Sequence, residues 1–541
     1  MTTKPWLKHY DKDVLRELVY PTIPLHSLLI QTAGKFPSHI CLQYGKQKFT
    51  YEQVVDLAKK TAFSLQRLGL KTGQSVGVVL PNVPQFVFAY FGILMAGGVV
   101  VPLNPVYTLN ELENQCKLTE VTFIIGWDKR KEVLQQITQD LGLNSLILTN
   151  DEEIEGFYSI RQEKEPRKQN QELCYLDLLT HDLQEQEERV VSYNSPAVLQ
   201  FSGGTTGTPK AAIALHRNLV ANTLQFREWL KLFKDGQEQF LTAIPLSHVY
   251  GMVIGLNVGL AMGATIHLIP DARDIDVILD CIQRQNISFY PGVPAMYYAI
   301  NQNKDVKAGL YSLSSIKACI SGSAPLNPEI RRTFESLTGG KLVEGYGLSE
   351  APTATHCNPI QGENINGSIG IPLPDVDSKI VPVAGDSTEI GELWVRGPQI
   401  MAGYFNQQSE TRQVLENGWL KTGDIGRMDD EGYFYLSGRN KELIKVGGLQ
   451  VWPREVEEVI MQLPEIQEVA VAGIPDMARG ETVKAWIVLK EGKTLDVGKI
   501  KAFCQNSLAY FKVPTEITYT KSIPKTPVGK VLKRELINNK E

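Results

Sequence analysis

Cysteine is sparse in this sequence, and its placement has no regular pattern. Seven cysteines are scattered over 541 residues, and no two of them form a Cys-x-x-Cys pair. An odd number at irregular spacing argues against a disulfide framework and against a zinc site, and fits a reducing compartment. The N-terminus, Met-Thr-Thr-Lys-Pro-Trp-Leu-Lys, also lacks the apolar core of a signal peptide. These absences predict a cytoplasmic protein.

A large excess of charge of either sign is also missing. The formal net charge is −5, with 43% hydrophobic and 21% charged residues, as in ordinary soluble proteins. This net charge gives no reason to expect binding to nucleic acid or to an anionic membrane. A long uncharged run, 86–103, is interrupted by Gly97-Gly98 and ends in β-branched residues. It predicts a buried helix and then a buried strand rather than a membrane span, and leaves weak contact with a membrane surface open.

The length of the chain and the changes in residue pattern along it predict several hydrophobic cores. Helical and strand-like runs alternate from 24 to about 195, which favours a parallel sheet covered by helices. We interpret the polar stretch 151–188 as a solvated insertion without function. Short strands and frequent turns from 367 to 438 predict a barrel-like subdomain, and the rest of the chain predicts a small mixed domain. No internal repeat is evident.

The stretch with the clearest chemical character is 201–210, Phe-Ser-Gly-Gly-Thr-Thr-Gly-Thr-Pro-Lys. Apolar residues before it predict a strand, and helical spacing at 218–226 predicts a helix after it. Such loops hold phosphates, because glycines let backbone N–H groups approach an anion while hydroxyls and Lys210 add donors. Pro209 stands where the GxxxxGK[ST] nucleotide loop needs its second glycine, so that motif is excluded. The periodic flanks argue against a flexible linker.

Three more strands are predicted to end in polar or glycine-rich residues, at 241–251, 321–326 and 342–350. Ligands of parallel sheets bind outside the carboxyl ends of the strands, so these ends and the 201–210 loop predict one shared cleft. Glu350 beside a phosphate loop would suit Mg²⁺ that bridges phosphate oxygens. A helix-capping or surface glutamate is the alternative.

Asp424 lies in the glycine-rich stretch 418–425, where its carboxylate could accept hydrogen bonds from both hydroxyls of a ribose. A turn aspartate is the alternative. Further on, 437–448 carries Arg439, Lys441 and Lys445 beside a pair of glycines. This stretch lies where the predicted barrel-like subdomain meets the predicted small mixed domain. Charges at such a junction are usually solvated, whereas paired glycines invite the close approach of a ligand or of another backbone.

The tail, 524–534, is basic. Pro527 and Gly529 predict a rigid turn that projects Lys530 outward. A tail that is merely solvated is the alternative.

Five of these stretches together resemble the adenylate-forming superfamily of acyl- and aryl-CoA synthetases, peptide-synthetase adenylation domains and firefly luciferase. They are 201–210, the end of 342–350 with Glu350, 418–425, 437–448 and 524–534. The resemblance covers about 25–533, and the order and spacing of the stretches make it specific. The opening Pro5-Trp-Leu-Lys-x-Tyr10 and the block 417–424 look most like bacterial medium- to long-chain fatty acid–CoA ligases. The resemblance implies an α/β N-terminal domain of helix-covered sheets with a β-barrel-like subdomain (1–438). It also implies a small mobile α+β domain (439–541).

The resemblance also implies roles for individual residues in the binding of ATP, Mg²⁺ and the acid. The ATP triphosphate would contact the loop, the adenine would contact the turn after 320 and stack on a tyrosine, and the ribose would contact a carboxylate and a guanidinium. The acid would meet a histidine, a tyrosine and a glycine. The triphosphate residues are Ser202, Gly203, Gly204, Thr205, Thr206, Gly207 and Lys210, and the adenine residues are Ser323, Ala324, Pro325 and Tyr346. The ribose residues are Asp424 and Arg439, and the acid residues are His248, Tyr250 and Gly322. Glu350 and Ser202 would bind Mg²⁺.

For the second step, the resemblance implies that CoA enters beside Lys445, Gly447 and Gly448 after a rotation at the hinge residue Lys441. Lys530 would contact the carboxylate and the α-phosphate during adenylation. Two positions depart from the usual pattern: Ala211 replaces a glycine, and Ser349 replaces a threonine. Both changes are small, and neither puts the activity in doubt.

The resulting hypothesis is an AMP-forming acid–thiol ligase that uses ATP, Mg²⁺ and CoA, with a medium- to long-chain fatty acid as its substrate. An aryl- or phenylpropanoid-CoA ligase is the nearest alternative, followed by adenylation with transfer to a carrier-protein thiol. A luciferase-like oxidase and a nucleotide-binding regulator without turnover are the remaining alternatives. The row Gly251, Gly255, Gly259 and Gly263 suggests room for a long or flat acid. The oligomeric state stays open.

Overall fold

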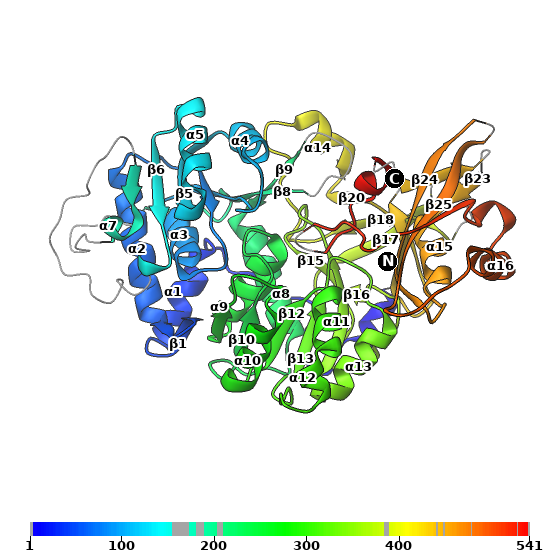
Figure 1. Ribbon diagram of the computed structural model, residues 1–541. Coiled ribbons are helices and arrows are strands. Elements are labelled where there is room, and N and C mark those ends of the chain that lie inside the picture. The colour runs from blue at the N-terminus through cyan, green and yellow to red at the C-terminus, as the bar shows by residue number, and fades with distance from the viewer. Residues whose placement is uncertain are drawn as a thin grey trace. The chain divides into compact units, whose positions relative to one another are not determined.

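The computed structural model describes residues 4–153, 172–179, 189–202, 209–382, 389–439, 442–446, 449–477, 479–526 and 529–538. Contacts within the chain divide it into two compact units. The larger contains 6–377 and 396–415, and the smaller contains 1–5, 378–395 and 416–541. Figure 1 shows the elements of both.

A seven-stranded sheet forms one layer of the larger unit. Its strands lie in the order β7-β6-β5-β3-β4-β8-β9, and all pairs are parallel except that of β8 with β9. Apolar side chains of β3, β4 and β5 build its core with leucines of the flanking helices, such as Leu112 and Leu134. The strands are β3 (Ser75–Val79), β4 (Val99–Pro102), β5 (Val121–Trp127), β6 (Ser145–Thr149), β7 (Glu172–Cys174), β8 (Pro196–Phe201) and β9 (Ala211–Leu215).

The second sheet of this unit has nine strands in the order β16-β15-β14-β13-β12-β10-β11-β1-β2. Its centre, from β1 to β14, is parallel, and antiparallel strands close both edges. The strands are β1 (Ile40–Tyr44), β2 (Gln47–Thr50), β10 (Gln239–Thr242), β11 (Thr265–Leu268), β12 (Phe289–Gly292), β13 (Ala318–Ser321), β14 (Lys341–Gly347), β15 (Ala354–Cys357) and β16 (Ile371–Pro372).

Helices connect these strands, and local signals set their limits. Thr50 and Gln53 form a reciprocal capping box at the start of α2. Gly92 lets α3 approach α2, because a Cβ there would lie 2.6 Å from Thr61 Cβ. The helices of the larger unit are α1 (His26–Lys35), α2 (Tyr51–Arg67), α3 (Pro84–Met95), α4 (Leu109–Leu118), α5 (Lys131–Leu141), α7 (Tyr175–Leu178), α8 (His216–Trp229), η4 (Tyr250–Asn257, a π-helix), α9 (Val258–Ala261), α10 (Ile275–Gln285), α11 (Pro294–Gln302), α12 (Lys304–Lys307), α13 (Pro328–Thr338) and α14 (Gln408–Val414), with short 3₁₀ turns at η1 (Pro5–His9) and η2 (Asp128–Arg130).

The smaller unit contains two five-stranded sheets. In one, β21 extends the order β17-β18-β20-β19, and in the other β26 extends β23-β22-β25-β24. Apolar clusters form on alternating residues of β24 and β25, one with Val471 and Ile487 and one with Ala472 and Trp486. The elements are β17 (Asp377–Pro382), β18 (Gly391–Arg396), β19 (Leu415–Glu416), β20 (Trp419–Met428), β21 (Phe434–Arg439), β22 (Ile444–Val446), β23 (Leu449–Val451), α15 (Pro453–Ile460), β24 (Ile466–Asp476), β25 (Gly480–Leu489), α16 (Val497–Ser507), η6 (Tyr510–Lys512), β26 (Glu516–Tyr519) and α17 (Lys533–Asn538).

The predicted fold class is confirmed: helix-connected parallel sheets, a β-rich region at 367–439 and an α+β C-terminal part are all present. The run 86–103 forms α3 and β4, both buried, as predicted. Within the described ranges, no helix has the length and hydropathy needed to cross a bilayer. The boundary between 438 and 439 stays a prediction.

One expectation about the fold was wrong. The stretch 151–188 is not merely a solvated insertion, because β7 pairs with β6 and the side chains of Tyr175 and Leu178 are buried. The helix predicted at 218–226 is present as α8. The strand β9 precedes it and pairs antiparallel with β8, so the 201–210 loop joins the two strands of a β-hairpin, which the sequence pattern did not predict.

Candidate functional site

The segment 201–210, which is predicted to bind phosphates, begins and ends on paired backbone. The Ser202 N–H donates to the Lys210 carbonyl oxygen at 2.9 Å, which closes the neck of the β8–β9 hairpin. The backbone of Lys210, the residue before β9, therefore lies next to that of Ser202. The other predicted residues of the loop, Gly203, Gly204, Thr205, Thr206 and Gly207, lie outside the described residues.

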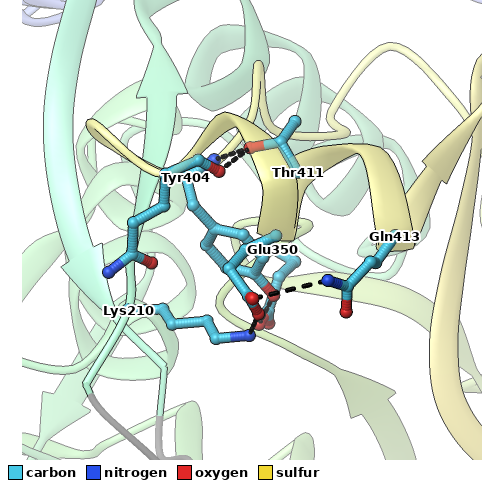
Figure 2. A network of polar contacts seen from close by, with 7 residues as sticks. Lys210, Glu350, Tyr404, Thr411 and Gln413 are labelled. Atoms are coloured by element: carbon cyan, nitrogen blue, oxygen red, sulfur yellow. Dashed lines mark hydrogen bonds and ion pairs between the residues drawn. The ribbon is translucent and has the colours of Figure 1, made fainter.

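The Lys210 side chain belongs to a polar network with α14, shown in Figure 2. Its ammonium pairs with the Glu410 carboxylate and lies 5.3 Å from the centre of the Tyr404 ring. The Tyr404 hydroxyl donates to Glu350 Oε1 at 2.8 Å. The Tyr404 N–H donates to Thr411 Oγ1, also at 2.8 Å. The network therefore joins Lys210, which is predicted to bind phosphate, to Glu350, which is predicted to bind metal.

Glu350 follows β14 and is held at both its backbone and its side chain. Its carbonyl oxygen accepts from the Met401 N–H at 2.9 Å, while Tyr404 orients its carboxylate. The described part of the chain contains no group of three or more His, Cys, Asp or Glu side chains that could hold a metal ion. Glu350 is thus a fixed carboxylate near the end of β14.

The strand ends of the two sheets are joined by hydrogen bonds, in agreement with the prediction that they meet. Gln200 Nε2 of β8 donates to the Ser247 carbonyl oxygen at 3.2 Å, beside His248. Ser349 Oγ donates to the Phe201 carbonyl oxygen at 3.3 Å. The ends of β8, β10 and β14 therefore lie together, although β8 belongs to the seven-stranded sheet.

Asn82, at the end of β3, makes the most extensive of these connections. Its Nδ2 lies 3.0 to 3.2 Å from the carbonyl oxygens of Thr242, Ile244 and Ile269. Its Oδ1 accepts from the Leu246 N–H at 2.8 Å, and the side chain is buried. Asn82 thus fixes the segment that leads to His248.

The three residues predicted to meet the acid lie on neighbouring segments. The Tyr250 N–H donates to His248 Nδ1 at 3.2 Å, and the Tyr250 hydroxyl donates to the Ile320 carbonyl oxygen at 2.7 Å. Burial raises the pKa of Tyr250 far above its ordinary value, so its hydroxyl stays protonated. A Cβ on Gly322 would lie 3.1 Å from Tyr250 Cε1, which places the glycine against the ring. The structure therefore gathers all three.

The row of glycines from 251 to 263 does not leave open space, so that expectation was wrong. A Cβ on Gly251 would lie 2.4 Å from the Pro245 carbonyl oxygen, and one on Gly255 would lie 2.9 Å from Thr242 Cγ2. Gly259 meets Phe240, and Gly263 meets Phe36, in the same way. These glycines let the helical segment η4–α9 pack closely on its neighbours, including β10. They do not enlarge a substrate pocket.

Tyr346, predicted to stack on adenine, lies on β14 opposite His356 of β15, with ring centres 5.9 Å apart. Burial lowers the pKa of His356 to about 3, so the imidazole behind Tyr346 is neutral at pH 7. The predicted adenine wall, Ser323, Ala324 and Pro325, forms the turn after β13, where Ser323 has a left-handed φ of 68°. The turn follows β13, which pairs in parallel with β14, the strand that carries Tyr346.

In the smaller unit, Asp424 and Arg439 are brought together as predicted. They are register partners across β20 and β21, and Arg439 Nε lies 3.0 Å from Asp424 Oδ1. The Asp424 side chain is only 7% exposed. The pair is therefore a preformed, largely buried carboxylate with its counter-ion.

The two predicted catalytic lysines of this unit lie on different elements. Lys445 is an exposed residue of β22 whose N–H donates to Glu481 Oε2 at 2.7 Å. Lys530 lies at the end of a turn in which the Thr526 N–H donates to its carbonyl oxygen at 2.8 Å. Just beyond it, Lys533 pairs with Glu457 at 3.0 Å. The predicted residues Lys441, Gly447, Gly448 and Pro527 lie outside the described residues.

Sequence reasoning missed Asn82, Gln200, Tyr404 and Glu410. The signal for Asn82 and Gln200 was present, since each is a polar residue at or next to the carboxyl end of a buried parallel strand. Tyr404 and Glu410 had no such signal, because their contacts with Glu350 and Lys210 span 54 and 200 residues of sequence.

Comparison with known proteins agrees with this geometry. The model of the AMP-binding enzyme family matches residues 29–405, and that of the AMP-binding enzyme C-terminal domain matches 455–530. A long-chain-fatty-acid–CoA ligase of Bacillus subtilis is 39% identical over 550 residues, covering 99% of this chain and 98% of its own. A 4-coumarate–CoA ligase of Vanilla planifolia is 30% identical, covering 98% and 97%.

Among solved structures, ATP-bound MatB from Rhodopseudomonas palustris superposes with a TM-score of 0.85 at 25% identity, covering 95% of this chain and 98% of its own. The matches to both family models define the class. The chain belongs to the AMP-binding enzyme family, and the resemblance inferred from its sequence is confirmed.

Proposed function

We propose that the protein is an AMP-forming acyl-CoA ligase that activates a medium- to long-chain fatty acid. The acid carboxylate attacks the α-phosphorus of ATP, which gives acyl-adenylate and pyrophosphate. The CoA thiol then attacks the acyl carbonyl, and AMP leaves. The observation that carries the proposal is the near full-length similarity to a long-chain-fatty-acid–CoA ligase, at 39% identity.

The nucleotide would be bound in parts by residues already described. Ser202 and Lys210 flank the loop for the triphosphate, and Tyr346 with the 323–325 turn receives the adenine. Asp424, held by Arg439, accepts hydrogen bonds from the ribose hydroxyls. The histidine His248 stands with Tyr250 and Gly322 for the acid. Contacts that bring the strand ends together support the assignments within the larger unit.

The residues present also fit Mg²⁺. Glu350 offers one oriented carboxylate and Ser202 a hydroxyl, a small donor set that suits an ion with phosphate and water as its other ligands. When bound, Mg²⁺ would neutralise phosphate charge. Lys530 would stabilise the negative charge that develops as the carboxylate approaches the α-phosphate. Lys445, Gly447 and Gly448 would line the entry of the CoA thiol, with residues 439–541 turning about Lys441 between the two steps.

We place the protein in the cytoplasm. All seven cysteines are described, all are free, and five are buried, which suits a reducing compartment.

Acid-dependent release of pyrophosphate, measured with and without CoA, tests the proposal. The acids would be short, medium and long fatty acids, benzoate and 4-coumarate. Turnover with CoA and a medium or long fatty acid is expected. Release of pyrophosphate without transfer to CoA would replace CoA with a carrier-protein thiol, and ATP binding without release for any acid would remove the ligase activity altogether.

An aryl-CoA ligase is the second candidate, favoured by the 30% identity to a 4-coumarate–CoA ligase over nearly the full length. It keeps every nucleotide contact and changes only the acid pocket. A higher kcat/KM with 4-coumarate or benzoate than with any fatty acid would select it.

A further inference from the structure

Lys210 already has an anionic partner within the chain. Its ammonium pairs with Glu410 Oε2 on α14, and Gln413 Nε2 lies 3.4 Å from the other carboxylate oxygen of Glu410. The side chains of Lys210 and Glu410 are 26% and 33% exposed, so the pair is partly shielded from water. In Figure 2 the side chains of Lys210, Glu350 and Gln413 converge beside α14.

We propose that Glu410 competes with the β- and γ-phosphates of ATP for Lys210 and thereby lowers the affinity of the enzyme for triphosphate and pyrophosphate. This inference rests on the proposed function, in which Lys210 binds the triphosphate. Glu410 acts through Lys210 and is a positioning residue rather than a catalytic one.

Charge is the reason for the competition. A phosphate that reaches Lys210 while Glu410 remains in place brings two anions to one cation, and their repulsion opposes binding. If Glu410 turns away instead, binding must break an ion pair first. In both cases the carboxylate reduces what the lysine contributes to affinity. A neutral group of the same shape at 410 removes this effect.

The surrounding contacts confine the effect to the triphosphate. Tyr404 is fixed at its backbone by Thr411 and at its hydroxyl by Glu350, and Gly403 packs so closely that a Cβ would lie 2.7 Å from Thr411 Cγ2. The first turn of α14 is thus anchored independently of Glu410. Exchange of partners at Lys210 needs rotation of two side chains and no movement of the helix, so sites for adenine and ribose are unaffected.

The test is equilibrium binding of ATP, pyrophosphate and AMP to full-length wild-type and Glu410→Gln protein by calorimetry, at fixed Mg²⁺ and salt concentrations. We expect the variant to bind ATP and pyrophosphate about two- to fivefold more tightly, the factor typical of a partly exposed ion pair, with AMP unchanged. The difference is expected to shrink as salt is raised. Unchanged AMP binding also reports that the variant is folded.

Two further variants make the outcome decisive. Glu172→Gln is the matched control, because Glu172 pairs with Lys131 at 2.6 Å elsewhere in the same unit, and it should change none of the three affinities. Lys210→Gln should weaken ATP and pyrophosphate. If Lys210→Gln leaves them unchanged, the proposed role of Lys210 is wrong, and this inference is overturned with it. If Lys210→Gln weakens them but Glu410→Gln does not tighten them, or tightens AMP equally, only the competition by Glu410 is refuted.

Discussion

Asp424 and Arg439 show what one pair of residues contributes. The carboxylate is 7% exposed and paired at 3.0 Å, so it is oriented before any ligand arrives. Asp424→Asn keeps the shape and removes the charge, and we expect the dissociation constants of AMP and ATP to rise by the same factor, about 10- to 100-fold. Equilibrium binding of both nucleotides measures this. The matched control Glu416→Gln, which removes a carboxylate paired with Lys421 at 2.6 Å, should leave both constants unchanged. A loss for ATP alone would refute the ribose assignment.

Gly322 sets the space beside the Tyr250 ring. A Cβ at 3.1 Å from Cε1 must displace that ring, whose hydroxyl is fixed on the Ile320 carbonyl oxygen. Gly322→Ala should therefore lower kcat/KM for the acid about tenfold, as one extra methyl in an apolar pocket does, with no change in AMP binding. Steady-state kinetics across fatty acids would show it. Tyr250→Phe added to Gly322→Ala should recover part of the loss, because the ring is then free to shift; no recovery would contradict this account.

Residues in glycine-rich stretches could be selected as candidates from the sequence. Lys210, Glu350 and Asp424 each stand in a stretch whose glycines are visible locally, and their proposed roles stay predictions. Glu410 could not be found this way, since its role depends on a contact across 200 residues. Local pattern predicts where a polar side chain sits on its own element, and only the folded chain decides which partner it meets.

Elements were predicted well where burial is uniform and less well where a distant partner decides. Ala211–Leu215, a short apolar run, is compatible with a helix start or a strand, and pairing with β8 makes it β9. The glycines of η4 and α9 were recognised, yet their purpose was misjudged. The spacing of these glycines shows that one face of the helical segment lacks side chains. It does not show whether that face contacts a ligand or the strand β10.

Asn82 connects the ends of β3, β10 and β11, so its effect belongs to the scale of elements. Asn82→Ala leaves the N–H of Leu246 and carbonyl groups such as that of Thr242 without this partner in a buried place. We expect the free energy of unfolding to fall by about 3 kcal/mol, and KM for the acid to rise because the His248 segment loosens. Urea unfolding and kinetics measure the two effects. Asn301→Ala removes a donor to the Ile330 carbonyl oxygen and should lower stability without changing KM; equal KM changes in both variants would argue against a positioning role.

The whole molecule is harder to predict than its parts, because its units are not contiguous in sequence. The segment 396–415 leaves the smaller unit, contributes Tyr404 and α14 to the larger, and returns at β19. Periodicity identifies each element in this segment but carries no information on the unit that it joins. The proposed turning of residues 439–541 about Lys441 is a property of this scale.

That turning predicts a separation of the two half-reactions. Lys530 lies on the turn after Thr526, and Lys445 is the middle residue of β22, which is distant from that turn in sequence. Lys530→Ala should abolish acyl-adenylate formation yet still convert supplied acyl-adenylate to acyl-CoA, and Lys445→Ala should show the reverse. Pyrophosphate release and single-turnover thioester formation measure the two steps. Loss of the same step in both variants would refute the two-step use of this domain.

Buried histidines make the stability of the whole chain depend on pH. Burial lowers the pKa of His216 and His356 from 6.5 to about 3, and that of His267 to about 4. Because the unfolded chain takes up protons below pH 6.5 and the folded chain does not, the free energy of unfolding must fall as pH falls from about 6.5 to 4. Each histidine contributes about 1.4 kcal/mol per pH unit at most. Urea unfolding at pH 7, 6 and 5 tests this, and His356→Gln should reduce the slope by about a third of the histidine contribution. An unaltered slope in His356→Gln would contradict a neutral buried imidazole in the folded protein.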